Sequence, residues 1–138
     1  MHITLPGDDE IPYRYCTEAL ITDGQVDFVE VKRKAKTFGD SVVVAGSPQR
    51  LRLHVHTNDP AELFDWLREK GELASMKAED MIRQFEVSHK RKYPIALVTD
   101  SACDLPQDII EKYQINVIPF TENFGKNRYL DKVTITTD

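Results

Sequence analysis

Two histidines, His54 and His56, stand two residues apart in a short run that alternates aliphatic with charged or polar residues. Residues i and i+2 of a β-strand point to the same side, so both imidazoles are predicted to project from one face. A cysteine, Cys16, lies upstream. Imidazole nitrogens and thiolate sulfur are ligands that zinc prefers. The pattern permits a zinc site, and it also fits two surface histidines, one of them hydrogen-bonded to Asn58 or Asp59.

The composition limits the classes of protein to consider. The chain has 138 residues, of which 41% are hydrophobic and 30% charged, which suits one modest domain or a small domain with an appendage. The net charge is -5 and the one basic cluster, Lys90–Lys92, is short, so nucleic acid is not an expected partner. Two cysteines without framework spacing indicate a reduced, cytoplasmic chain. No apolar run approaches the length of a membrane span.

The elements that must position the histidines are predicted for residues 1–88. Apolar residues recur at helical spacing from Phe28 to Phe38, and Gly39 follows where a C-cap glycine would stand. Asp59 as N-cap and Pro60 at the first helical position mark a second helix. The stretch 73–87 has poor periodicity and is assigned to a final strand. The predicted strands are 13–21, 41–45, 50–56 and 73–87, and the predicted helices are 28–38 and 60–70.

The resulting order, β-α-β-β-α-β, predicts an α/β fold of the ferredoxin-like class, an antiparallel sheet with two helices on one face. In the strand of the two histidines, Leu51, Leu53 and Val55 would face the core. His54 and His56 would then lie on the opposite face, which solvent or a ligand can reach.

After a predicted linker at 89–93, residues 94–138 read as the first β-α-β unit of a further α/β domain. The apolar run Ile95–Val98 predicts a strand buried on both faces. A helix is predicted at 107–113 with Tyr113 inward, then a strand at 116–120 and a polar loop or hairpin tip at 123–131. Because one such unit cannot cover a parallel sheet, we expect either a truncated C-terminus or a tail that docks elsewhere.

The loop Thr99-Asp100-Ser101 follows the first strand of this unit. Open α/β sheets bind ligands at the carboxyl ends of their strands, so these three residues are candidates for a ligand-binding loop. The alternative is a plain strand-to-helix turn in which Ser101 satisfies local backbone donors.

Several motifs resemble one family in the order in which they occur. Tyr15–Ile21, Phe38–Val44 and Leu53–Pro60 resemble the middle domain of the catalytic subunit of bacterial fatty acid kinase, which is related to dihydroxyacetone kinase. This resemblance covers about residues 11–88. Further motifs resemble the opening of the DegV family, at 96–101, 104–106 and 115–124. The whole chain therefore resembles part of a fusion of kinase-like and DegV modules.

The resemblance implies that Cys16, His54 and His56 are metal ligands, for zinc. An oxygen ligand, or an acceptor for an imidazole N–H, could come from one of three acidic residues. These candidates are Glu18, Asp40 and Asp59.

The resemblance also implies partners. The kinase middle domain is expected to dimerise and to meet the acyl carrier, and DegV proteins bind fatty acids, so the partners would be a fatty acid or acyl phosphate, the kinase domain of the parent protein and a second copy. Thr99, Asp100 and Ser101 would be the lipid-binding residues.

The expected departures concern catalysis. The sequence holds no P-loop and no carboxylate cluster suited to ATP and magnesium, and the ATP-binding domain and most of the lipid pocket are missing. We therefore do not expect this chain to transfer phosphate alone, whereas the parent protein would be a fatty-acid-kinase-like phosphotransferase. Two rival functions stay open. One is a zinc-dependent hydrolase or lyase with Glu18 or Asp40 as general base. The other is a metal-free ferredoxin-like sensor of small molecules.

Overall fold

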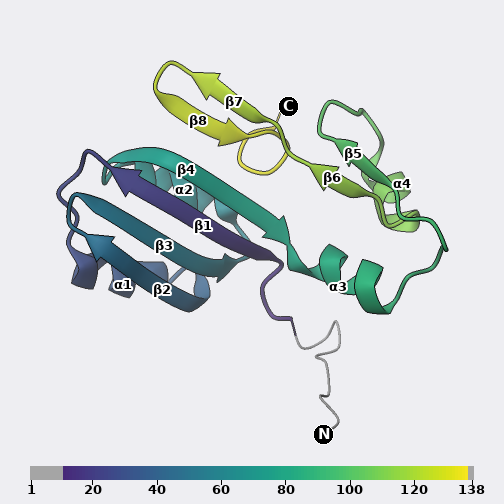
Figure 1. Cartoon of the computed structure of the whole chain (residues 1–138), viewed down its shortest axis with the longest axis horizontal. Coiled ribbons are helices and arrows are strands. Elements are labelled where there is room, and N and C mark those ends of the chain that lie inside the picture. Colours follow the sequence, from purple (N-terminus) through teal and green to yellow (C-terminus); the bar gives the residue numbers. More distant parts are fainter. Residues whose placement is uncertain (1–10, 137–138) are drawn as a thin grey trace, which may run out of the picture.

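The computed structural model of the chain describes residues 11–136, so the first ten residues of the predicted 1–88 domain lie outside the described residues. The first six elements form a four-stranded antiparallel sheet in the order β2-β3-β1-β4 with two helices (Figure 1). This confirms the predicted ferredoxin-like fold. The six elements are β1 (Tyr15–Thr22), α1 (Phe28–Ala35), β2 (Gly39–Ser47), β3 (Arg50–Thr57), α2 (Pro60–Arg68) and β4 (Glu72–Asp80).

Helices α1 and α2 lie against the same face of the sheet (Figure 1). Alternate residues of β1 and β3 point into this layer, as the period of two in a strand requires. The other face of the sheet carries no helix in the described part of the chain. The core residues include Ala19, Ile21, Leu51, Leu53 and Val55 from the strands and Val31, Leu63, Phe64 and Leu67 from the helices.

The caps of the helices confirm one prediction and correct another. The Asp59 carboxylate accepts a hydrogen bond from the backbone N–H of Glu62 at 3.0 Å, as an N-cap does. The predicted C-cap at Gly39 is wrong, because α1 already ends at Ala35 with Lys36 as its cap. Gly39 instead opens β2, where a Cβ atom would lie 1.7 Å from the carbonyl oxygen of His56. A glycine is needed there because the two backbones approach so closely.

The strand predicted at 73–87 is wrong in its second half. β4 ends at Asp80, and a helix, α3 (Met81–His89), follows directly. The Asp80 carboxylate caps this helix by accepting from the backbone N–H of Arg83 at 2.9 Å. The stretch therefore joins a strand period to a helix period, and a single window over both shows neither pattern clearly.

The remaining elements form two small sheets. β5 (Val98–Asp100) pairs in parallel with β6 (Asn116–Ile118) around α4 (Gln107–Lys112). This confirms the predicted β-α-β order, but the first strand begins at Val98 and not at Ile95. β7 (Thr121–Phe124) and β8 (Asn127–Leu130) form an antiparallel hairpin. We call residues 11–89 the N-terminal region and residues 98–136 the C-terminal region.

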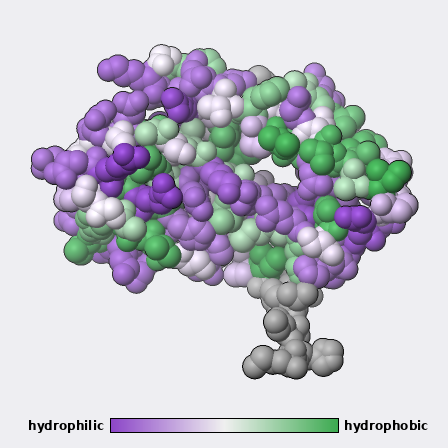
Figure 2. All heavy atoms as spheres, viewed as in Figure 1, coloured by the Kyte–Doolittle hydropathy of each residue, from purple (hydrophilic) through white to green (hydrophobic). Residues whose placement is uncertain are grey.

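Burial around β5 does not follow the prediction. Ile95 is 73% exposed and Val98 62% exposed, and Tyr113 is 38% exposed rather than buried. Figure 2 shows apolar side chains gathered on the surface of this part of the molecule. The reason is that a two-stranded parallel sheet with one helix has too few layers to cover the apolar residues of β5.

Two groups of contacts join the C-terminal region to the N-terminal region. In the first, the Glu111 carboxylate on α4 accepts hydrogen bonds from Arg14 at 3.2 Å and from Arg83 at 2.5 Å. In the second, the guanidinium of Arg68 lies 4.1 Å from the ring centroid of Tyr129. In the described residues, no helix is long and apolar enough to cross a membrane.

Candidate metal centre

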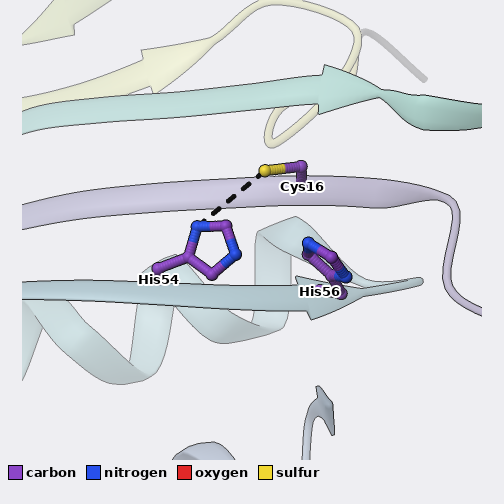
Figure 3. Close-up of side chains that lie close together, drawn as sticks. All are labelled: Cys16, His54 and His56. Carbon is purple, nitrogen blue, oxygen red and sulfur yellow. Dashed lines mark hydrogen bonds between the residues drawn. The ribbon is translucent and has the colours of Figure 1, made fainter. Parts of the chain in front are cut away.

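The pairing of β1 with β3 brings the cysteine to the two histidines. In this antiparallel register Cys16 lies opposite His56, and Glu18 lies opposite His54. Residues directly opposite each other in a ladder point to the same face. All four side chains therefore lie on the open face of the sheet, and Figure 3 shows the Cys16 thiol beside the two imidazoles.

The three candidate ligand atoms are close enough to share one ion. One ligand atom each from Cys16, His54 and His56 lies within 4.8 Å of the other two. The Cys16 Sγ is 3.9 Å from Nδ1 of His54, and the two imidazole centroids are 5.0 Å apart. Around tetrahedral zinc, such atoms are roughly 3.3–3.6 Å apart. Small side-chain rotations would therefore bring the three atoms to coordination distance.

Carboxylates accompany both imidazoles. Glu18 Oε1 lies 3.9 Å from Nδ1 of His54, and Asp40 Oδ1 lies 3.5 Å from Nδ1 of His56. A carboxylate facing one ring nitrogen favours a proton there and leaves the other nitrogen free to bind a metal. The geometry thus favours Nε2 as the metal-binding atom of His56.

Asp59 does not join this group. Its carboxylate serves as the N-cap of α2, and in the described part of the chain it makes no hydrogen bond or ion pair with Cys16, His54 or His56. The physical reason is its position, because Asp59 falls past the end of β3 and has left the open face of the sheet.

A β-bulge places Asp40 opposite His56. The register of β2 against β3 shifts between Asp40 and Val43. Ser41, inside this bulge, has φ of 54°, a left-handed conformation that residues other than glycine rarely adopt. Bulges near functional sites commonly re-aim a side chain, and here the bulge keeps Asp40 at the histidine while the rest of β2 continues along β3.

The electrostatic surroundings differ between the ligands. Burial, then the negative charges of Glu79 and Glu18, raise the pKa of the Cys16 thiol. Burial, then the neighbouring His54, lower the pKa of His56, so its neutral form is favoured. A bound cation would oppose the first effect, because an adjacent positive charge stabilises the thiolate.

Glu79 was not among the residues predicted for the site. It lies opposite Cys16 in the β1–β4 pairing and is held by Lys77 at 2.9 Å. Glu79 lies near Cys16 because β4 pairs with the side of β1 that β3 leaves free. The sequence signal that could have pointed to it is the polar alternation of Lys77 and Glu79 within the predicted last strand.

Thr99, Asp100 and Ser101 lie apart from this cluster, in the C-terminal region. Thr99 and Asp100 belong to β5 rather than to the predicted loop, and only Ser101 follows the strand. Ser101 is 1% exposed, and its hydroxyl oxygen accepts a hydrogen bond from the backbone N–H of Phe120 at 2.9 Å. The Asp100 carboxylate accepts from the backbone N–H of Ala102 at 3.1 Å. The Asp100 contact is that of a plain turn, whereas the Ser101 hydroxyl bonds a backbone donor 19 residues away rather than a local one. Lipid binding by these residues stays a prediction.

The family comparisons agree with the two regions of the fold. Residues 12–88 match the FakA-like middle-domain family of fatty acid kinase. The chain belongs to this family. Residues 94–138 match the DegV family, so the middle-domain segment is followed by a DegV-related segment. The resemblance seen in the sequence motifs is thereby confirmed.

Similar proteins occur in staphylococci. The chain is 36% identical over 89 residues to an uncharacterized protein of Staphylococcus haemolyticus strain JCSC1435, a match that covers 61% of this chain and 16% of the relative. It is 33% identical over 90 residues to an uncharacterized protein of Staphylococcus aureus strain USA300, covering 62% of this chain and 16% of the relative. The chain thus matches only a small part of the length of these relatives.

Proposed function

We propose that Cys16, His54 and His56 bind one zinc ion on the open face of the sheet. The observation that carries this proposal is the convergence of their ligand atoms to within 4.8 Å of one another. One sulfur and two nitrogen donors suit zinc and disfavour magnesium or calcium, which take oxygen ligands. The lowered pKa of His56 supports the proposal, since the neutral imidazole is the form that binds a metal.

The proposed role is organisation of a larger protein. Three protein ligands leave a fourth position for water or for a group from a partner. The sheet face around the ion carries no helix in the described residues, so a partner surface can reach that position. We propose that this segment organises a fatty-acid-kinase-like and DegV-related protein that binds fatty acids and forms acyl phosphate, and that its partners are a second copy and the kinase domain.

The geometry argues against a cysteine nucleophile at this site. In a nucleophile–histidine–carboxylate relay, the nucleophile and the carboxylate contact opposite nitrogens of the imidazole. Here Cys16 and Glu18 both face Nδ1 of His54. The raised pKa of Cys16 also disfavours the thiolate in the absence of a cation.

Metal content tests the proposal. We expect about one zinc per chain by elemental mass spectrometry after purification with zinc and without chelator. The His54→Ala/His56→Ala variant should lose it. His89→Ala is the matched control, because His89 stacks on Phe85 in α3, away from the cluster, and should keep the metal. Equal zinc in the double variant and the control, or no zinc in any sample, would contradict the proposal.

A second candidate is hydrolysis or a lyase reaction by a zinc-bound water, which the carboxylates beside both imidazoles favour. We would measure turnover of activated esters by the zinc-loaded chain, with Glu18→Gln and Asp40→Asn as variants. Turnover that is lost in either variant while zinc stays bound would support the enzyme. Absence of turnover with zinc bound would leave the organising role.

A further inference from the structure

A cleft of about 670 Å³ lies between the N-terminal and C-terminal regions. Figure 2 shows the molecule hollowed between the sheet and the apolar C-terminal surface. The volume falls in the range of clefts that bind ligands. Its walls combine apolar with charged side chains, and the lining residues include Met76, Ala78, Val117, Ile118, Leu130 and Asp131.

One wall of the cleft is the free edge of β4. Met81 donates its backbone N–H to the carbonyl of Arg14 at 2.8 Å, which fixes the phase of hydrogen bonding between β1 and β4. Because hydrogen-bonded pairs alternate in an antiparallel ladder, Glu79 and Lys77 also bond to β1. Ala78 stands between them, so its N–H and C=O point away from β1, into the cleft.

The opposite wall is the free edge of β6. Asn116 donates its N–H to the carbonyl of Leu97, and the carbonyl of Ile118 accepts from the N–H of Ser101, both at 2.9 Å. These bonds go to the β5 side of the strand. Val117 lies between the two bonded residues, so its N–H and C=O point the other way. β6 pairs only with β5 in the described residues.

The edge of β4 already accepts a donor farther along. The carbonyl of Ala74 takes a hydrogen bond from the Arg128 guanidinium at 3.0 Å. Toward Ala78 the edge continues without such a side-chain donor in the described part of the chain. Free edges of this kind are templates for another strand.

We propose that this cleft binds an extended peptide segment of a partner protein. The peptide would pair as an added strand with the edge of β4, and the other edge of the peptide would face Val117. Two facing rows of backbone donors and acceptors match an extended chain better than they match a compact small molecule. Met76 and Ile118 offer apolar contacts to alternate side chains of the peptide.

Charge complementarity narrows the chemistry of the peptide. Asp131 lines the cleft, and among the described residues it forms no ion pair. The neighbouring Lys132, which also lines the cleft, is paired with Asp104. The cations Arg14, Lys77 and Arg83 on the opposite wall are already paired with carboxylates. The segment should therefore alternate aliphatic with polar residues and carry a lysine or arginine at Asp131.

A pair of probe peptides tests the proposal. The first is a fluorescein-labelled peptide in which valine alternates with threonine around one central lysine, and the second is the same peptide N-methylated at alternate residues. We expect anisotropy to report binding of the first peptide only, because N-methylation removes the strand donors. At saturation the backbone amides of Ala78 and Val117 should exchange at least about tenfold more slowly than in the free chain.

Two variants sharpen the result. Ala78→Pro removes the outward N–H of β4 while leaving its bonds to β1, so it should abolish binding of the first peptide. Asp131→Asn should weaken the lysine peptide about fivefold or more and leave a threonine-substituted peptide unchanged. The Asp131→Asn variant also keeps the test valid if Ala78→Pro does not fold. Equal binding of both peptides, no binding of either, or slow exchange of the two amides in the free chain would each overturn the proposal.

Discussion

The N-terminal and C-terminal regions have similar apolar sequences and opposite patterns of burial. In the N-terminal region Leu51, Val55 and Phe64 are fully buried. In the C-terminal region Ile118 is 59% exposed and Phe124 57% exposed. The difference lies in the number of layers, because a four-stranded sheet with two helices encloses its own core. A two-stranded parallel sheet with one helix, and a separate two-stranded hairpin, do not.

This comparison shows what apolar sequence alone fails to specify. A strand rich in aliphatic residues becomes core only where a second layer covers it. Ile115 and Leu130 are buried apolar residues of the C-terminal region, and Leu130 packs into the N-terminal core. The C-terminal region therefore depends on contacts with the N-terminal region, and its exposed apolar surface is suited to further contacts.

The largest expected effect concerns the difference in burial between the two regions. Phe64→Ala should lower the free energy of unfolding by about 3–5 kcal/mol, because it opens a cavity in a closed core. Phe124→Ala is the matched change in the C-terminal region and should lower the free energy of unfolding by no more than about 0.5 kcal/mol. Urea denaturation followed by far-UV circular dichroism measures both. Similar losses for the two variants would break the comparison.

The next effect concerns the two kinds of glycine. Gly39→Ala would force a methyl group against the His56 carbonyl and should cost about 1–3 kcal/mol. Gly125 has open space around it but φ of 62°, so Gly125→Ala should cost about 1 kcal/mol from backbone strain alone. Thermal unfolding gives both values, and zinc uptake adds a second readout. Gly39→Ala should reduce zinc uptake, and Gly125→Ala should leave it intact.

A smaller effect should appear where Glu111 joins the regions. Burial alone would raise the pKa of Glu111, but Arg83 and Arg14 lower it below the ordinary 4.5. The folded form therefore favours the carboxylate, so the stabilisation is full above pH 4.5 and is lost as the pH falls through the lowered pKa. Since Glu111 is partly exposed and screened by solvent, we expect about 1 kcal/mol or less.

Limited proteolysis in residues 90–97 measures this junction. Glu111→Gln should increase cleavage at pH 7 and remove the increase that the original chain shows on acidification. Glu122→Gln, in β7, changes the same type of side chain away from the two arginines and should behave as the original chain. A pH profile that is identical for Glu111→Gln and the original chain would show that the carboxylate does not hold the regions together.

The candidate metal site was accessible to sequence reasoning because its two histidines obey a local rule. Spacing of two in a strand placed His54 and His56 on one face, and the pairing of β1 with β3 then brought Cys16 to them. Glu79 could not be found in this way, since its place depends on the pairing of β1 with β4. The place of Asp40 opposite His56 likewise depends on a β-bulge, which the periodicity of the sequence does not predict.

The ferredoxin-like fold was predictable because most of its elements carry local signals, such as the Asp59 cap and the alternation in β3. Two failures have different causes. The boundary between β4 and α3 was missed because one window covered a strand period and a helix period. The exposure of Ile95 depends instead on what lies beside the segment in space. Local sequence patterns indicate which secondary structure a segment prefers, whereas its burial depends on the elements that pack against it.

The smallest expected effect tests whether the bulge beside the candidate metal site is strained. Ser41→Gly should stabilise the chain by about 0.5 kcal/mol, because glycine adopts φ of 54° without penalty but loses more entropy on folding. Ser47→Gly, in the same strand and outside the left-handed region, should destabilise it slightly. Thermal unfolding of both variants gives the sign. If Ser41→Gly also keeps its zinc affinity, Asp40 is held at His56 by the register of β2, whereas a loss of affinity would show that the serine side chain takes part in holding the bulge.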